Sequence, residues 1–191
     1  MSSLSRQQMV EFASRVNIEN KSVFDVGSGP EQYWARNWLK GKPSNYYTLD
    51  INKDYNVDFT HDINYPFNIK QKFDVILCFE TLEHVWNPIQ AVKNLMNHAR
   101  KDSHIYISTP FINPIHDTHD FLRYTDEWYL KVFKEYFEVP DVKAYTREAT
   151  EGLSSLFDFY SKEGLRMSKI RLKKGESNKL KIIGYFIDVT V

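Results

Sequence analysis

Hydrophobic and polar positions along the chain form strand-like runs and helix-like stripes in alternation. Phe73–Phe79 is almost continuously apolar, which is typical of a strand buried on both faces of a parallel sheet. After Asn87 and Pro88, apolar residues recur at helical spacing, so a helix is expected to begin there. The same reasoning predicts further strands at 22–26, 46–49, 57–59 and 104–109, and further helices at 5–18, 30–40 and from Thr125 onward.

The last quarter of the chain has a different pattern. Residues 137–144 and 180–191 are predicted strands, joined through a helix near 153–166 and a polar turn at 173–178. Strands that alternate with helices and end in a strand pair indicate an α/β fold, a three-layer α-β-α sandwich around a mostly parallel sheet. A length of 191 residues is expected to give a single domain, 1–191.

Composition excludes some classes of function and favours a compartment. Lysine plus arginine and aspartate plus glutamate both number 25, so no overall field attracts nucleic acid or an anionic membrane. Cys78 is the only cysteine, which excludes an intrachain disulfide and fits a reducing compartment. The chain starts without a signal-peptide pattern and has no apolar run of about 18 residues. We therefore expect a soluble, cytoplasmic protein.

Residues 23–33 predict a strand that breaks into a glycine turn and then a helix. Gly27 and Gly29 can adopt backbone angles that other residues avoid, and Pro30 suits the first position of a helix. The helix would direct free N–H groups and the positive end of its dipole at an anionic group. The turn is therefore expected to hold a ligand.

The residues around the turn narrow the choice of ligand. A dinucleotide site would need a third glycine where this chain has Gln32, and no Gly-Lys-Ser/Thr element of a phosphate-binding loop follows Gly27. Asp50 ends the next predicted strand, where its carboxylate can accept both hydroxyls of a ribose. Asp25, just before the turn, is expected to order the turn or to meet an ammonium group.

Four segments in order resemble class I S-adenosylmethionine-dependent methyltransferases, in the small-molecule branch of type 11-like members. They are Val-Phe-Asp-Val-Gly-Ser-Gly-Pro at 23–30, Leu-Asp at 49–50, Asp-Ile-Asn-Tyr-Pro-Phe at 62–67 and the segment 73–85 that ends in Leu-Glu-His-Val. The likeness spans residues 20–137. It implies a Rossmann-like sheet of seven strands in the order 3-2-1-4-5-7-6, an N-terminal helix within 1–20, and a flanking segment, 145–178, that covers the site.

The resemblance also implies S-adenosyl-L-methionine as the cofactor. Backbone N–H groups of the turn would bind the cofactor carboxylate, Asp50 the ribose and Asp62 the adenine amino group. Glu31 departs from the family, which often has glycine at that position. The expected cofactor-binding residues are Asp25, Gly27, Ser28, Gly29, Asp50, Ile51, Asp62, Ile63, Phe79 and Glu80.

Methyl transfer from a sulfonium needs a positioned acceptor and the exclusion of water. Where the acceptor is a hydroxyl, a general base contributes about 10²–10⁴-fold, and histidine suits this role near neutral pH. The segment 110–125 resembles a His-x-x-x-Asp-x-x-Arg-Tyr-Thr loop of methyltransferases associated with sugar and polysaccharide biosynthesis.

This loop supplies the candidate catalytic residues. We expect His116 or His119 to be the base and Asp120 to orient it. Arg123 would contact an anionic acceptor or brace the loop, and Tyr124 would help to bind the acceptor. Alternatively, Asp120 and Arg123 form a structural ion pair and the histidines fix the loop. His116, His119 and Asp120 could also ligate zinc or iron, but loop spacing alone is weak evidence and we expect no metal.

His84 is a second candidate base, unless it only caps or packs against the next helix. An Asn/Asp-Pro-Pro-Tyr element of amino-directed DNA methyltransferases is absent after Phe79, and Cys78 lacks the preceding proline of a cytosine C5 nucleophile.

The expected function is O-methylation of a small hydroxylated metabolite, a sugar or glycan precursor. N-methylation of a small amine and a non-catalytic cofactor-binding scaffold are the alternatives. Neither nucleic acid nor membrane is an expected partner, and a homodimer is compatible with the sequence.

Overall fold

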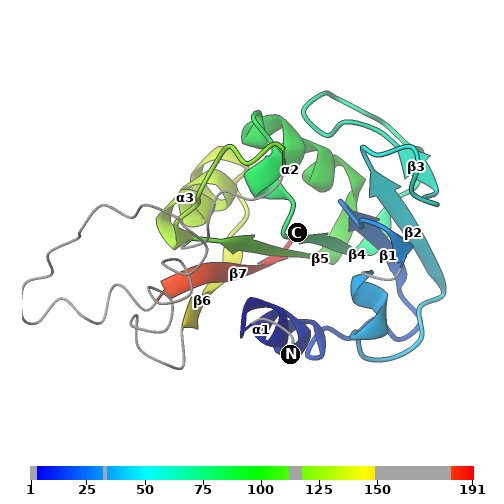
Figure 1. Cartoon of the computed structure of the whole chain (residues 1–191), viewed down its shortest axis with the longest axis horizontal. Helices are drawn as coiled ribbons and strands as arrows, with labels where there is room; N and C mark the ends of the chain where they lie inside the picture. The colour runs from blue at the N-terminus through cyan, green and yellow to red at the C-terminus, as the bar shows by residue number, and fades with distance from the viewer. Residues whose placement is uncertain (1–3, 32–33, 112–117, 149–181) are drawn as a thin grey trace, which may run out of the picture.

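The computed structural model describes residues 4–31, 34–111, 118–148 and 182–191. Within these ranges the chain forms a seven-stranded sheet in the order β3-β2-β1-β4-β5-β7-β6, which crosses the middle of Figure 1. This order confirms the Rossmann-like sheet expected from the sequence. The strands are β1 (Ser22–Val26), β2 (Asn45–Asp50), β3 (Phe59–Thr60), β4 (Phe73–Phe79), β5 (Ala99–Pro110), β6 (Asp141–Glu148) and β7 (Ile182–Thr190).

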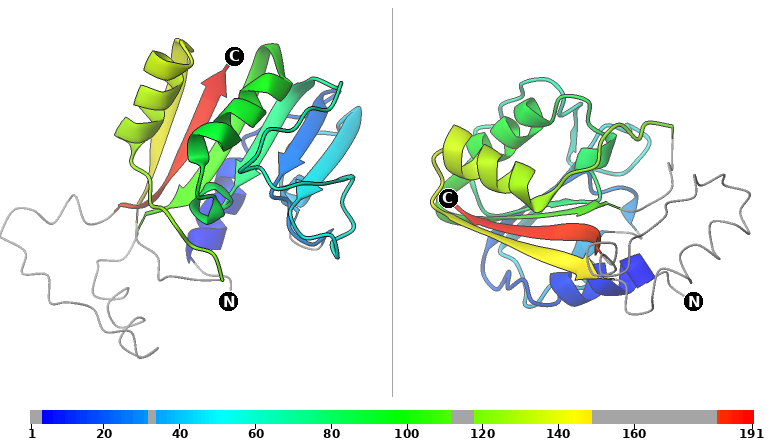
Figure 2. Two further views of the ribbon diagram at one scale, coloured as in Figure 1. Left: turned by 90° about the horizontal axis from the view of Figure 1, so that it is seen from above. Right: turned by 90° about the vertical axis from the view of Figure 1, so that its left-hand side faces the viewer.

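Strands β1 to β5 pair in parallel, whereas β7 runs antiparallel to both β5 and β6. Helices cover the two faces of the sheet: α2 (Pro88–His98) and α3 (Asp126–Leu130) lie on one face and α1 (Leu4–Ala13) lies on the other (Figure 2). In the described part of the chain, no helix is long and apolar enough to cross a membrane.

The alternation of side chains along each strand divides the core between these two faces. Phe24 and Ile76 pack in the larger cluster, under α2 and α3, whereas Val23 and Val75 pack in the smaller cluster with Ala13. Successive side chains of a strand point to opposite faces, and the apolar residues of β4 accordingly divide between the two clusters. The predicted burial of Phe73–Phe79 on both faces of the sheet is confirmed.

The predicted helix at 30–40 is wrong for the residues described there, which have 3-10 conformation at Glu31 and over Ala35–Asn37 and no α-helix. Trp34 takes an extended backbone (φ −59°, ψ 134°), and its indole Nε1 donates to the Gly29 carbonyl at 2.7 Å. Trp34 and Ala35 are buried, so packing of this segment takes precedence over helix formation. In the described residues that follow Pro30, no α-helix directs its dipole at the glycine turn.

The other predicted elements differ from the structure mainly at their ends. Thr125 caps α3 as expected, because its side chain accepts from the Trp128 amide, and the helix continues as a π-helix over Lys131–Tyr136. Because the helical segment continues to Tyr136, β6 begins at Asp141 and not at the predicted residue 137. The helix predicted near 153–166 and the turn at 173–178 lie outside the described residues.

Candidate functional site

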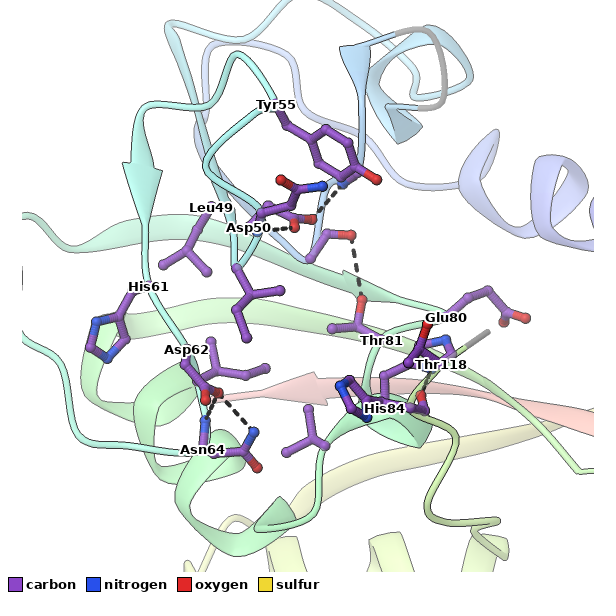
Figure 3. Close-up of a pocket in the computed structure, with 17 residues that line it drawn as sticks. Leu49, Asp50, Tyr55, His61, Asp62, Asn64, Glu80, Thr81, His84 and Thr118 are labelled. Carbon is purple, nitrogen blue, oxygen red and sulfur yellow. Dashed lines mark hydrogen bonds between the residues drawn. The ribbon is translucent and has the colours of Figure 1, made fainter. Parts of the chain in front are cut away.

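A cavity of about 510 Å³ lies at the carboxyl edge of the sheet. It is formed by the segments that follow β1, β2, β3 and β4, together with residues 118–119 (Figure 3). This edge is where open α/β sheets bind ligands, and the volume falls in the range of about 300–1,000 Å³ typical of small-molecule sites. Among the residues predicted from sequence, this cavity is lined by Gly27, Gly29, Asp50, Ile51, Asp62, Ile63, Glu80, His84 and His119.

A second, smaller cavity of about 210 Å³ adjoins the first on the other side of the glycine turn. Its lining includes Asp25, Ser28 and Phe79, which were predicted, and Met9 of α1, which was not. The two cavities share Gly27, Gly29 and Glu80. The cofactor residues predicted from sequence therefore gather around one elongated space with two ends.

The glycine turn depends on its two glycines for different reasons. Gly27 (φ +72°) and Gly29 (φ +66°) both have left-handed backbones, which other residues adopt at a cost. A Cβ on Gly27 would lie 2.2 Å from Thr81 Oγ1, whereas a Cβ on Gly29 would meet nothing within 4 Å. Gly27 thus allows the turn after β1 to pass directly over the segment that follows β4.

The amides of this turn already donate hydrogen bonds within the protein. The Gly27 and Ser28 amides donate to the Leu49 carbonyl at 2.8 and 3.1 Å, and the Gly29 amide donates to Asp50 Oδ2 at 2.9 Å. The expected role of these N–H groups as a receptor for a ligand carboxylate is therefore not supported by their geometry. They hold the turn against the end of β2 instead.

Asp50 is fixed at the end of β2 with its carboxylate in the larger cavity. Besides the Gly29 bond, its Oδ1 accepts from the Asn52 amide at 2.9 Å, and Asp50 is only 8% exposed. The next residue, Ile51, is 65% exposed although it is apolar. An oriented carboxylate beside an uncovered apolar side chain suits a ligand that presents hydroxyls and a flat ring.

Asp62 is oriented by asparagines that the sequence analysis missed. Asn64 donates to Asp62 Oδ1 from its backbone N at 2.9 Å and from Nδ2 at 2.7 Å. The Oδ1 atom of Asn64 in turn accepts from the Asn87 amide at 2.9 Å. From α2, buried Asn94 donates to the Ile63 carbonyl at 3.0 Å. Asn94 lies off the apolar stripe of α2, so its burial has no signal in the sequence, although a buried polar group needs partners such as these.

The loop after residue 117 is attached to the short 3-10 turn Leu82–His84. The Phe121 and Leu122 amides donate to the Glu83 carbonyl at 2.8 and 3.2 Å. Tyr124 is 3% exposed, and its hydroxyl donates to the Leu82 carbonyl at 2.9 Å. These contacts make Tyr124 a structural residue, which does not fit the acceptor-binding role predicted for it.

Asp120 and Arg123 form an ion pair in which both guanidinium nitrogens contact the carboxylate. The Asp120 side chain is fully buried and that of Arg123 is 23% exposed. Neither residue is among the described lining of the two cavities. This geometry matches the structural alternative for the pair, so the predicted contact of Arg123 with an anionic acceptor is not supported.

His84 and His119 both line the larger cavity, whereas His116 lies outside the described residues. The Nδ1 atom of His84 hydrogen-bonds the backbone carbonyl of His119. A carbonyl can only accept, so this bond places the proton of a neutral His84 ring on Nδ1 and the lone pair on Nε2. The ring of His119 stacks on Phe121, with centroids 5.7 Å apart and planes at 5°. The sequence ranks the loop histidines first, but the geometry favours His84 as a base.

A comparison with protein families identifies the chain. Residues 5–153 match the family model described as a methyltransferase domain. The chain belongs to this methyltransferase domain family. No curated protein matches it in sequence.

Solved structures show the same fold in this methyltransferase family. A SAM-dependent methyltransferase from Archaeoglobus fulgidus is 15% identical with a TM-score of 0.57, and the match covers 98% of this chain and 92% of that one. An S-adenosylmethionine-dependent methyltransferase from Clostridium acetobutylicum is 11% identical with a TM-score of 0.56, and covers 98% and 89%. The plantazolicin methyltransferase BpumL, solved in complex with SAH, is 15% identical with a TM-score of 0.54, and covers 98% and 84%. At these identities the likeness establishes the fold.

In this methyltransferase domain, the residue that departs from the family pattern points away from the site. Glu31 pairs with Arg36 at 2.9 Å, and its side chain is 59% exposed. Arg36 in turn lies over the Trp34 ring, 4.4 Å from its centroid. Glu31 is not among the described lining residues of either cavity, so it leaves their shape unchanged.

Glu83, the acid of the Leu-Glu-His-Val segment, is buried, which the sequence did not predict. Its side chain has no exposed surface, and among the described residues neither of its carboxyl oxygens has a hydrogen-bond partner. Burial, with a contribution from Glu80, raises the pKa of Glu83 well above its usual range. Glu83 therefore holds a proton more readily than an exposed glutamate, and its Oε1 lies 3.8 Å from His84 Nε2. Within the described chain, no group of three or more histidines, cysteines and acids is arranged to hold a metal ion.

Asp25 is buried beside the smaller cavity, and Tyr46 donates to its Oδ2 at 2.7 Å. Burial raises the pKa of Asp25 from its usual 3.8 to about 7, because the charged form loses its hydration. The folded protein then keeps a proton that the unfolded chain has lost between pH 4 and 7. The free energy of unfolding should fall as pH rises through this window, by an amount on the order of a few kcal/mol.

Asp25→Asn should abolish this pH dependence and make the protein more stable than wild type at pH 8, because it replaces a buried charge with a neutral isostere. The bond from Tyr46 does not require a charge at this position, since the amide oxygen of an asparagine can also accept. Denaturant unfolding between pH 4 and 8 measures the effect, with exposed Asp54→Asn as the control. An unchanged pH dependence in Asp25→Asn would show that Asp25 is ionised in the folded state across this range.

Proposed function

We propose that the protein is an S-adenosylmethionine-dependent methyltransferase that methylates a hydroxyl group of a small metabolite, with a sugar or glycan precursor as the preferred acceptor. One observation carries the proposal. Two cavities meet at the glycine turn, one with the carboxylates of Asp50 and Asp62 and the other with Asp25. This division matches a ligand with a nucleoside at one end and an amino acid at the other.

The residues of the larger cavity fit the adenosine half of the cofactor. Asp50 accepts the ribose hydroxyls, and Asp62 accepts from the adenine amino group through the carboxylate that Asn64 orients. Exposed Ile51 and buried Ile63 pack on the two sides of the ring. Family membership and fold neighbours that are SAM-dependent methyltransferases, one of them solved with SAH, support the same cofactor.

The smaller cavity fits the amino-acid half. Asp25 meets the ammonium group of the cofactor, which favours the ionised form of its carboxyl group. Ser28 and Phe79 border the aliphatic chain that joins the cofactor's amino-acid end to its sulfur. Since the carboxylate of Asp25 forms only as the pH rises past about 7, cofactor affinity should increase with pH across that value.

His84 acts as the general base on the acceptor side. When bound, the cofactor supplies an electrophilic methyl group on a sulfonium. His84 Nε2 takes the proton of the acceptor hydroxyl, while its Nδ1–H stays on the His119 carbonyl and fixes the ring. Val85, Thr118 and His119 line the same cavity and limit the access of water to the reacting atoms.

The lining of the cavities supports a neutral acceptor. Within its described part, neither cavity has a lysine or arginine, so a phosphorylated acceptor lacks a partner there. Asparagine, threonine, tyrosine and histidine side chains line the larger cavity and hydrogen-bond hydroxyls well. The likeness of the loop around His119 to those of sugar-associated methyltransferases supports a sugar. The acidic lining also favours a second candidate, N-methylation of a small amine, because the carboxylates attract a cationic acceptor.

A turnover assay tests the proposed function. The protein is incubated with S-adenosylmethionine and separate pools of sugars, other hydroxylated metabolites and small amines, and S-adenosylhomocysteine is measured by mass spectrometry. We expect S-adenosylhomocysteine to be released with a pool of sugars or other hydroxylated metabolites and not with the amines. Release with amines alone supports the second candidate, and binding without release in any pool indicates a cofactor-binding scaffold. Affinity for a nicotinamide dinucleotide in place of S-adenosylmethionine would contradict both methylation functions.

A further inference from the structure

Glu80 occupies the junction of the two cavities. Of the three residues that both cavities share, Gly27, Gly29 and Glu80, only Glu80 has an ionisable side chain. Figure 3 shows it at the opposite end of the larger cavity from His61. A ligand that extends from one cavity into the other therefore passes beside this residue.

The structure holds Glu80 in this place with several bonds from β5. Its backbone N–H donates to the Ser108 carbonyl at 2.9 Å, and the Ser108 hydroxyl donates to Glu80 Oε1 at 2.8 Å. Ser108 itself is fully buried. Glu80 also has a left-handed backbone, with φ +47°, which is strained for a non-glycine residue and typical of functional sites. Its position is thus imposed by the fold.

The covalent structure of the proposed donor places its sulfur at the same junction. The sulfur joins the ribose to the amino-acid chain, so a donor with adenosine in the larger cavity and the amino acid in the smaller one has its sulfonium between them. We propose that the Glu80 carboxylate is the counter-charge of this sulfonium and makes the site prefer the charged donor over its neutral thioether product. This inference rests on the proposed function.

The preference has a direct consequence for turnover. Donor and product differ at the sulfur, which carries a positive charge before methyl transfer and none after it. Attraction to a carboxylate a few ångströms away at partly buried sites favours the charged ligand by about tenfold or more. Once the methyl group has left, that attraction is lost, so Glu80 favours the replacement of bound product by a new donor molecule while leaving product affinity itself almost unchanged.

Calorimetry with S-adenosylmethionine and S-adenosylhomocysteine tests the proposal on wild type and Glu80→Gln. The glutamine variant keeps the shape and the bond from Ser108 but removes the charge. It should weaken donor binding by about tenfold or more and product binding by less than about threefold, because only the donor is charged. Asp50→Asn is the matched control, since Asp50 contacts the ribose of both ligands and its loss should weaken both by the same factor. Thermal unfolding checks that each variant is folded.

The outcomes separate this proposal from the proposed function. Equal weakening of both ligands in Glu80→Gln, or no weakening of either, would overturn the role of Glu80 and leave the function intact. Failure of the wild-type protein to bind either ligand would instead overturn the proposed function. A selective loss of donor affinity in Glu80→Gln, with an even loss in Asp50→Asn, supports the counter-charge.

Discussion

Replacing His84 by glutamine should lower the turnover number by about 10²–10⁴-fold, the contribution of a positioned general base, with little change in cofactor affinity. The His84 ring lies in the larger cavity with Nδ1 bonded to the His119 carbonyl. Glutamine occupies similar space but has no basic nitrogen, so the acceptor proton has no local destination. Steady-state kinetics with the acceptor found in the turnover assay, and calorimetry with S-adenosylmethionine, measure the two parts of this prediction.

His119→Gln is the matched control for this variant. His119 contributes its backbone carbonyl to the bond with His84, and that atom is kept when the side chain changes. A small effect in His119→Gln beside a large one in His84→Gln supports His84 as the base. A large loss of turnover in His119→Gln, with normal turnover in His84→Gln, would identify His119 of the loop as the base, as the sequence suggested.

Gly27→Ala should lower the free energy of unfolding by roughly 3 kcal/mol or more and abolish cofactor binding. The left-handed backbone at φ +72° costs alanine roughly 1–2 kcal/mol. In addition, the new Cβ would lie 2.2 Å from Thr81 Oγ1 and 2.8 Å from Thr81 Cβ, and such overpacking adds roughly 1–3 kcal/mol. Because the Thr81 Cβ moves only with its backbone, a change of rotamer does not relieve the clash, and the turn must shift in the cavity.

Gly29→Ala separates the two costs. Gly29 has a similar backbone (φ +66°) but open space around its Cβ position, so only the conformational cost of roughly 1–2 kcal/mol applies. Urea unfolding and calorimetry on both variants measure the difference. Equal destabilisation by the two substitutions would mean that the close approach of Thr81 to the turn does not constrain residue 27.

The sequence predicts the sheet well because its signals are local. Phe73–Phe79 had to be a doubly buried strand, and its bounds are confirmed by the structure. The carboxyl ends of parallel strands meet at one edge, so Asp50 and Gly27 were expected at one site and line one cavity. The helix predicted at 30–40 failed because Trp34 finds its partners in tertiary structure, a bond to the Gly29 carbonyl and burial against the sheet.

Roles that depend on contacts between distant segments could not be predicted. The tautomer of His84 is set by the carbonyl of residue 119, and nothing near His84 in sequence reveals that bond. Asn94 lies on the polar side of its helix in the sequence pattern, and its role is visible only when the Ile63 carbonyl lies beside it. The ion pair of Asp120 and Arg123 was one of two alternatives in the sequence, since ion pairs and catalytic pairs have the same spacing, and the orientation of a base at residue 116 by Asp120 stays a prediction.

A crystal structure of the protein with S-adenosylhomocysteine tests the central claim most directly. The account predicts electron density for adenine between Ile51 and Ile63 with its amino group at Asp62, the ribose at Asp50 and the sulfur beside Glu80. The amino-acid end should reach Asp25 in the smaller cavity. Density for the ligand elsewhere, or its adenine in the smaller cavity, would contradict the assignment of the two cavities and the methyl transfer derived from it.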